Sequence, residues 1–266
     1  MVRNTDPKIS VVIPARNEAR NLEVVLPELP PVDQVVLVDG GSVDGTLDVA
    51  RRIMPGITAI EQTRRGKGNA LVCGFDAAFG DIIVMFDADG SANPKEIWDF
   101  VEALTAGADF AKGTRFPPLG GGSLDITALR RAGNAALNGL TNTLLHARFT
   151  DLCYGYNAFW RDIVPLLDLP PAHTSVPTDR LSWGDGFEIE TMINCRVAAA
   201  GLTIAEVPSV ERERIFGETN LRTFADGSRV LRTIISEYRR YRDSRRPNDA
   251  LVAAQVLDEL VAKETW

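Results

Sequence analysis

Short runs of apolar residues recur along the first half of the chain and alternate with longer amphipathic stretches. Four runs are too short for helices and are typical of strands buried on both faces; they cover residues 9–13, 35–38, 57–60 and 82–86. The stretches that follow them have the apolar spacing of helices and cover residues 21–29, 46–54, 69–79 and 94–104. This alternation predicts a mostly parallel sheet of right-handed βαβ units flanked by helices.

The second half of the chain gives sparser signals of the same kind. Strand-like runs at 108–112 and 203–208 and helical spacing at 129–146, 185–200 and 228–246 continue the α/β pattern. Glycine and proline predict an irregular stretch at 116–123, which is a candidate lid. Residues 170–183 are predicted to form an irregular insertion, and residues 247–266 an acidic helix. We therefore expect residues 1–224 to form one α/β domain and residues 225–266 a C-terminal helical extension.

Composition narrows the class of protein. The 266 residues are 45% hydrophobic, which is enough for one ordinary core, and the net charge of -7 argues against a nucleic-acid binder. The three cysteines are widely spaced, so they indicate neither a zinc site nor a disulfide framework and favour a reducing cytoplasm. No stretch reaches the roughly 18 to 20 apolar residues of a membrane span, and we expect a cytoplasmic protein, soluble or peripheral on the inner membrane face.

Polar loops follow each of the first four predicted strands, at residues 14–18, 39–42, 63–68 and 87–89. In parallel α/β sheets, ligands bind beyond the carboxyl ends of the strands. We therefore expect these four loops to line one crevice.

Asp87 and Asp89 lie two residues apart directly after the fourth predicted strand. In an extended backbone their carboxylates point to the same side, where they repel unless a cation joins them. Mg²⁺ or Mn²⁺ held by one or two carboxylates and completed by phosphate oxygens is a common arrangement. A solvated turn is the alternative for an isolated Asp-x-Asp, but the neighbouring polar loops favour metal and diphosphate binding.

Two other loops carry chemistry of their own. Residues 39–46 join a strand to a helix, and Asp39 could accept a hydrogen bond from a ribose or a base. Ser42 stands where the dinucleotide fingerprint requires its second glycine, which excludes that motif. Residues 64–69 offer cations and amides to a phosphate, although Asn69 is incompatible with a P-loop. The alternatives are a helix cap near Thr46 and a solvated basic loop.

Together, these segments resemble the family 2 glycosyltransferases of the GT-A fold, and within them the dolichyl-phosphate mannosyltransferase and polyprenyl-phosphate glycosyltransferase branch. The resemblance extends from about residue 8 to residue 221. Seven segments occur in the family's order, at residues 12–18, 39–46, 66–70, 87–90, 113–116, 151–159 and 207–219. It implies a Rossmann-like GT-A fold and an enzyme that transfers a hexose from a UDP- or GDP-sugar.

The resemblance also implies roles for individual residues. It assigns nucleotide binding to Pro14, Ala15, Glu18, Asp39, Lys67, Asp87 and Ala88, and a divalent cation, Mg²⁺ or Mn²⁺, to Asp87 and Asp89. Basic positions near the transferred sugar and the phosphates correspond to Arg115, Arg131 and Arg214, and a candidate base or acceptor-positioning carboxylate to Asp151. The reaction it implies is inversion by single displacement.

The acceptor side departs from the family pattern. Thr219 and Asn220 stand where the branch usually has Ser-Lys, and Tyr154-Gly155-Tyr156 replaces the commoner Ser-Gly-Phe. We favour a polyprenyl phosphate acceptor, with a soluble saccharide or small-molecule hydroxyl as the alternative, for which Asp151 would have to act as the base. A binding module for nucleotide sugars without turnover is a more remote alternative.

Residues 228–246 form a basic amphipathic pattern. Apolar positions such as Val230, Ile234 and Tyr238 fall on one side and seven arginines surround them. Such a helix is compatible with peripheral contact to anionic lipid, with docking on the core, or with contact to a second copy of the chain.

Overall fold

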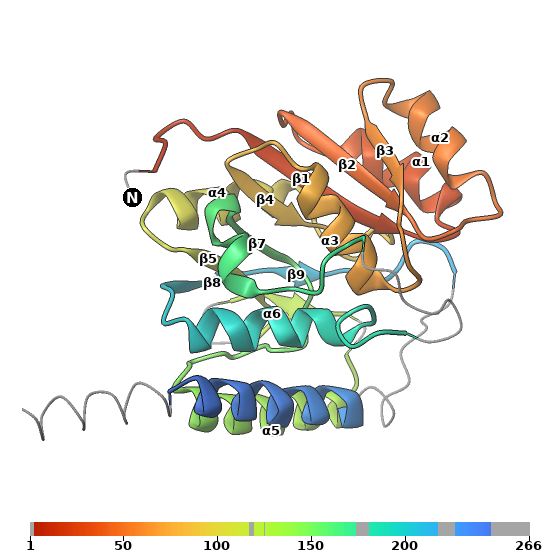
Figure 1. The fold of residues 1–266 in the computed structure, drawn as a ribbon. Coiled ribbons are helices and arrows are strands. Elements are labelled where there is room, and N and C mark those ends of the chain that lie inside the picture. The colour runs from red at the N-terminus through yellow and green to blue at the C-terminus, as the bar shows by residue number, and fades with distance from the viewer. Residues whose placement is uncertain (1–2, 117–119, 125, 174–180, 218–226, 246–266) are drawn as a thin grey trace, which may run out of the picture.

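The centre of the molecule is a sheet of seven strands in the order β3-β2-β1-β4-β7-β5-β8 (Figure 1). The computed structural model describes residues 3–116, 120–124, 126–173, 181–217 and 227–245. The strands are β1 (Ile9–Ala15), β2 (Gln34–Asp39), β3 (Thr58–Glu61), β4 (Ile82–Met85), β5 (Phe110–Thr114), β7 (Asn157–Trp160) and β8 (Ile204–Pro208). Each of the six predicted strands is present, which confirms the mostly parallel α/β sheet.

Helices flank the sheet where amphipathic spacing predicts them. They are α1 (Ala19–Glu28), α2 (Thr46–Ile53), α3 (Lys67–Ala77), α4 (Ile97–Thr105), α5 (Ala128–Leu145) and α6 (Glu188–Ala199), with 3-10 turns η1 (Pro94–Glu96) and η2 (Arg161–Leu167). The side chain of Asn93 caps η1 by accepting a hydrogen bond from the backbone N–H of Lys95 at 3.2 Å. The helix predicted from residue 185 begins at Glu188, because the Glu188 carboxylate accepts the backbone N–H groups of Gly184 and Gly186 and holds the preceding residues in a loop.

β7 is the strand that the sequence pattern did not predict. It lies between β4 and β5 and is antiparallel to both. Phe159 fixes it in the core, with its ring centroid 5.3 Å from that of Phe75 and 5.9 Å from that of Phe110. Because β7 runs in the opposite direction, its first residue lies at the edge where the parallel strands end, and the loop that precedes it reaches the crevice.

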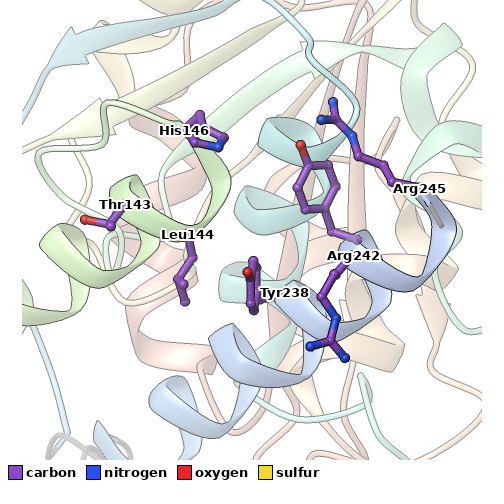
Figure 2. A pocket seen from close by; sticks show the side chains of 7 residues that line it. Thr143, Leu144, His146, Tyr238, Arg242 and Arg245 are labelled. Atoms are coloured by element: carbon purple, nitrogen blue, oxygen red, sulfur yellow. The ribbon is translucent and has the colours of Figure 1, made fainter. Parts of the chain in front are cut away.

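The C-terminal helix, residues 227–245, lies next to α5, below α6 in the view of Figure 1. Ile234 is fully buried and joins a second small core with Leu145 and Cys195. A hollow of about 390 Å³ remains between the ends of the two helices; in Figure 2, Tyr238 faces Leu144 of α5. The helix is therefore docked on the core, as one alternative for residues 228–246 expected.

Some expectations concern segments with little regular structure. Gly122–Ser123 forms a short strand, β6, which pairs with β9 (Val210–Glu211), so the end of the stretch predicted to be irregular is regular. Residues 170–173 and 181–183 contain no helix or strand, as predicted. Three expectations concern residues outside the described part of the chain: the domain boundary at 224 and 225, the pair Thr219 and Asn220, and the helix at 247–266. Within the described part of the chain, no helix combines the length and apolarity of a membrane span.

Candidate active site

Two loops at the carboxyl edge of the sheet, after β1 and β2, are fastened to each other. The backbone N–H of Asn17 donates to Oγ of Ser42 at 2.8 Å, and that of Glu18 donates to Oγ1 of Thr46 at 3.0 Å. Asp44 accepts the backbone N–H of Thr46 at 3.1 Å, but the N-cap of α2 is Gly45 and has no side-chain cap, so capping by an Asp and a Ser is not observed. These contacts fix Glu18 at the N-cap of α1, at the mouth of the crevice.

Asp39 ends β2 with one of its carboxylate oxygens unsatisfied. Its Oδ2 accepts the backbone N–H groups of Gly41 and Ser42 at 3.0 and 2.9 Å, whereas its Oδ1 is buried without a hydrogen-bond partner. A buried acceptor without a donor is unfavourable, and a ligand hydroxyl or N–H would satisfy it. Pro14 and Ala15, also expected at the nucleotide, form the end of the neighbouring strand β1 in register with Val38 and Asp39.

Lys67 lies between two carboxylates. Its Nζ is 2.7 Å from Oδ1 of Asp87 and 2.7 Å from Oε1 of Glu190, and its side chain is 16% exposed. Burial by itself lowers the pKa of Lys67, but the two carboxylates outweigh burial and raise that pKa, so the ammonium group stays protonated. Ala88, which follows Asp87, is buried.

Arg214 lies on the other side of the Asp-x-Asp pair. Its guanidinium is 3.3 Å from Oδ2 of Asp89 and 3.1 Å from Oε1 of Glu18. The backbone N–H of Ile215 donates to the carbonyl oxygen of Asp89 at 3.2 Å, which fastens the segment after β9 to the loop after β4. Oδ1 of Asp89 accepts both the N–H and the hydroxyl of Ser91. Residues more than 120 positions apart therefore converge on Asp89.

Asp87 and Asp89 suit a hard divalent cation. Carboxylate oxygens are the ligands that Mg²⁺ and Mn²⁺ prefer, and such ions commonly complete their shell with phosphate and water oxygens. The described residues contain no group of three or more His, Cys, Asp or Glu side chains arranged to hold a metal ion. Two carboxylates leave places in the shell of such an ion for diphosphate and water oxygens.

The basic loop before α3 was expected to offer its cations and amides to a phosphate, but it contacts other parts of the protein instead. Arg64 forms a bidentate ion pair with Asp185 at 2.9 and 2.7 Å, and the backbone N–H of Gly68 donates to the carbonyl oxygen of Asp185 at 2.7 Å. A Cβ on Gly68 would lie 1.9 Å from the carbonyl oxygen of Gly184, so glycine permits this close approach. The glycines therefore dock the loop against the start of α6, and Lys67 is the side chain of this loop that reaches Asp87.

Asp151 and Arg115 form a separate cluster, where the family resemblance predicts the acceptor. Asp151 is fully buried and accepts hydrogen bonds from the Arg115 guanidinium at 2.7 and 2.9 Å, from the Arg115 backbone N–H at 3.1 Å and from Asn134 at 3.0 Å. The same guanidinium also pairs with Glu211 of β9 at 2.9 Å. This geometry favours a positioning role for Asp151, and its role as a base stays a prediction.

Arg131 and Phe116 lie beside this cluster. The guanidinium carbons of Arg131 and of Arg115 are each 5.8 Å from the centroid of the Phe116 ring. Arg131 is exposed at the start of α5, so it is accessible to an anionic acceptor. The four residues expected to be catalytic therefore fall into two groups, with Arg214 on the Asp-x-Asp side and Arg115, Arg131 and Asp151 on the other.

Sequence reasoning missed Glu190 and Glu211. Glu190 lies on α6, more than 100 residues from the Asp-x-Asp pair, and its contact with Lys67 depends on how the loop before α3 docks on Asp185. Glu211 lies on β9, a strand of two residues that has no clear pattern. The only sequence signal near Glu190 was the acidic segment 185–190, in which three of six residues are Asp or Glu. 

Comparison with known proteins identifies the family of the chain. The family model described as Glycosyl transferase family 2 matches residues 10–164. The chain is 30% identical over 224 residues to Undecaprenyl-phosphate mannosyltransferase of Micrococcus luteus, covering 80% of this chain and 87% of the relative. It is 29% identical over 223 residues to Polyprenol monophosphomannose synthase of Mycolicibacterium smegmatis, covering 79% and 80%.

Solved structures give the same fold. The chain superposes on glucosyl-3-phosphoglycerate synthase from Mycobacterium tuberculosis, in complex with Mn²⁺, UDP-glucose and phosphoglyceric acid, with a TM-score of 0.63 and 25% identity. The alignment covers 87% of this chain and 80% of that one.

Proposed function

Because the chain belongs to glycosyl transferase family 2 and is a hexosyltransferase, we propose that it transfers a hexose from a UDP- or GDP-sugar to a polyprenyl phosphate, with a divalent cation held by Asp87 and Asp89. The observation that carries the donor part is the convergence at one sheet edge of the unsatisfied Asp39 Oδ1, the Asp-x-Asp pair and the cations of Lys67 and Arg214. The relatives named for polyprenyl phosphates support the acceptor part.

The proposed reaction is a single displacement. An acceptor oxygen forms a bond to the anomeric carbon while the bond from that carbon to the diphosphate breaks and its electron pair leaves with the nucleoside diphosphate, which inverts the configuration. When bound, the divalent cation neutralises charge on the diphosphate. Lys67 and Arg214 add positive charge on either side of it, and such preorganised charge is commonly the largest contribution to catalysis.

A phosphate acceptor suits the acceptor side of the site. The attacking oxygen of a phosphate is already anionic, so no residue has to remove a proton. The oxygens of Asp151 already accept four hydrogen bonds, which is compatible with a reaction that needs no base. Arg115 and Arg131 supply the charges that would orient an anionic acceptor.

The test is direct transfer. Purified protein is incubated with UDP-glucose or GDP-mannose, with Mg²⁺ or Mn²⁺, and with a short-chain polyprenyl phosphate; mass spectrometry detects the product and NMR of the anomeric proton gives its configuration. We expect a metal-dependent polyprenyl phosphate hexose of inverted configuration. Retention would contradict the displacement mechanism, and the absence of transfer from every donor would contradict the donor site.

A small phosphate-bearing acid is the second candidate acceptor, and the complex of the structural relative with phosphoglyceric acid favours including it. A parallel incubation with 3-phosphoglycerate, and another with soluble sugars, separates these acceptors from the lipid. Transfer only to a water-soluble acceptor would overturn the polyprenyl phosphate part of the proposal and leave the donor part intact.

We also propose that the protein works at the cytoplasmic face of a membrane. On the helix over residues 227–245, Leu231 and Ile235 are 40% and 38% exposed, although Ile234 is buried. Arg242 and Arg245 in the last turns of this helix are exposed, and in Figure 2 they lie beside the hollow between the helices. Exposed apolar side chains among arginines are the composition expected of a surface that contacts anionic lipid.

A further inference from the structure

Two basic side chains of the site each contact two carboxylates, in the same pattern. Lys67 is 2.7 Å from Asp87 and 2.7 Å from Glu190. Arg214 is 3.3 Å from Asp89 and 3.1 Å from Glu18. Each aspartate of the Asp-x-Asp pair therefore shares a cation with a glutamate that comes from another element, α6 or the N-cap of α1.

This pattern creates a conflict between cations. A divalent cation bound to Asp87 and Asp89 would stand beside an ammonium and a guanidinium group, and like charges at such short distances repel strongly. Lys67 is only 16% exposed and Arg214 only 27%, so neither charge is free to move into bulk water. A basic side chain displaced from its aspartate needs another carboxylate as a partner. Lys67 already contacts Glu190, and Arg214 already contacts Glu18.

We propose that Glu190 and Glu18 are positioning residues that retain Lys67 and Arg214 when a divalent cation takes their places on Asp87 and Asp89. The inference rests on the proposed donor site. By this exchange the two basic side chains stay beside the cation, within reach of the phosphates of the donor.

The two glutamates lie on other elements than the aspartates. Glu190 lies on α6 with its side chain 14% exposed, and a Cβ on Gly155 would come within 2.4 Å of its Oε1, so glycine at 155 leaves room for the carboxylate. Glu18 accepts a hydrogen bond from the side chain of Asn21 in addition to that from Arg214. When the contacts to the aspartates break, Glu18 therefore keeps Asn21 and Arg214 as partners, and Glu190 keeps Lys67.

A double-mutant cycle on Mn²⁺ binding tests the exchange without measuring activity. The dissociation constant is measured from the electron paramagnetic resonance signal of free Mn²⁺, with the metal alone, for wild type, Glu190→Gln, Lys67→Met and the double variant. Glu190→Gln leaves Lys67 on Asp87, and we expect it to weaken Mn²⁺ binding roughly tenfold, the ratio typical of a charge-assisted hydrogen bond. Lys67→Met removes the competitor and is expected to tighten binding.

The decisive comparison is the effect of Glu190→Gln when Lys67 is absent. If Glu190 acts by retaining Lys67, the substitution changes Mn²⁺ affinity by less than about twofold in the Lys67→Met background. An equal weakening in both backgrounds would mean that Glu190 contacts the metal or acts through its charge alone, and would overturn the inference. Glu61→Gln, which removes an exposed charge at the same sheet edge, is the matched control and should change the affinity less than twofold.

The second pair of residues provides an independent cycle. Glu18→Gln and Arg214→Met lie on other elements, and we expect the same non-additivity in their cycle. Thermal unfolding monitored by circular dichroism identifies any variant that misfolds. Because the two cycles are independent, misfolding of one variant does not decide the outcome. Additive effects in both cycles would refute the exchange but not the donor site. Failure of the wild-type protein to bind Mn²⁺ both alone and in the presence of UDP would instead contradict the proposed metal site, and with it the inference.

Discussion

Asp89 has two roles at the level of a single side chain. It orders its surroundings by accepting hydrogen bonds from Ser91 and pairing with Arg214, and it is one of two candidate ligands for a divalent cation. Asp89→Asn keeps the shape of the side chain and most of its acceptor capacity but removes its charge. We expect kcat/KM to fall by about a hundredfold or more, because the variant loses charge stabilisation in the transition state.

The thermal midpoint of Asp89→Asn should stay within a few degrees of wild type. Asp48→Asn, an exposed carboxylate on α2, is the control and should retain full activity. Transfer at the wild-type rate by Asp89→Asn would contradict the metal role.

Lys112 gives the protein a pH-dependent stability. It is fully buried in β5, where its Nζ donates to the carbonyl oxygens of Gly113 and Tyr154, and burial lowers its pKa from 10.5 to about 8. Between these two pKa values the unfolded chain binds a proton at Lys112 that the folded chain does not, so this residue makes stability rise with pH from about 8 toward 10.

We expect the difference in free energy of unfolding between Lys112→Met and wild type to shift by about 2 kcal/mol in favour of wild type from pH 7 to pH 10. Urea denaturation at several pH values measures it. The exposed Lys95→Met serves for comparison and should show no such shift, and a difference that does not vary with pH would show that Lys112 keeps its ordinary pKa.

The identities of most site residues follow from the sequence, but their partners do not. Asp87 and Asp89 stand out because they follow a predicted buried strand. Neither the contact of Lys67 with Glu190 nor that of Asp151 with Asn134 has a local signal, because each depends on how α6 or α5 packs against a distant loop. This is why Asp151 reads as a candidate base in the sequence and as the anchor of Arg115 in the structure.

At the level of elements, the C-terminal helix is held by a buried ion pair. Arg196 of α6 contacts the Glu237 carboxylate at 2.8 and 2.9 Å, and both side chains are almost fully buried. Arg196 also donates to the carbonyl oxygens of Leu167 and Asp168. Removing one partner of such a pair leaves a buried charge without its counter-ion, which is strongly unfavourable.

Glu237→Ala should therefore lower the free energy of unfolding by about 3 to 5 kcal/mol. Arg242→Ala, which removes an exposed ion pair with Asp243 on the same helix, should cost less than about 1 kcal/mol. Urea denaturation followed by circular dichroism compares the two. Similar losses for both variants would mean that the buried pair contributes no more than a surface pair.

Periodicity predicts the elements of this protein well where they are long or fully apolar. β1, β2 and β4 and helices such as α5 follow from it, since each has either a continuous buried run or a clear apolar face. β7 was missed because its four residues sit within a motif-rich segment and are followed by a 3-10 helix, η2, rather than by an amphipathic α-helix. Its antiparallel direction is a property of the whole sheet, which no local pattern encodes.

At the level of the whole molecule, we expect the outer face of the C-terminal helix to bind anionic lipid vesicles. Sedimentation with vesicles rich in phosphatidylglycerol should pull down the protein, whereas vesicles of phosphatidylcholine should not, and high salt should weaken binding. Reversing the charges of Arg239 and Arg242 together should weaken binding by about tenfold or more. The same reversal at Arg51 and Arg52 of α2 is the control. Equal effects of the two reversals would show that the C-terminal helix is not the surface that contacts the membrane.

The position of β7 also affects how the protein is made. A ribosome completes β1 to β4 and their helices before it reaches Asn157, so during that interval the Ile82–Met85 strand has no neighbour on one side. An unpaired apolar strand edge is a template for pairing with other chains. We therefore expect a nascent chain that stalls before β7 to aggregate more readily than one that has completed this strand.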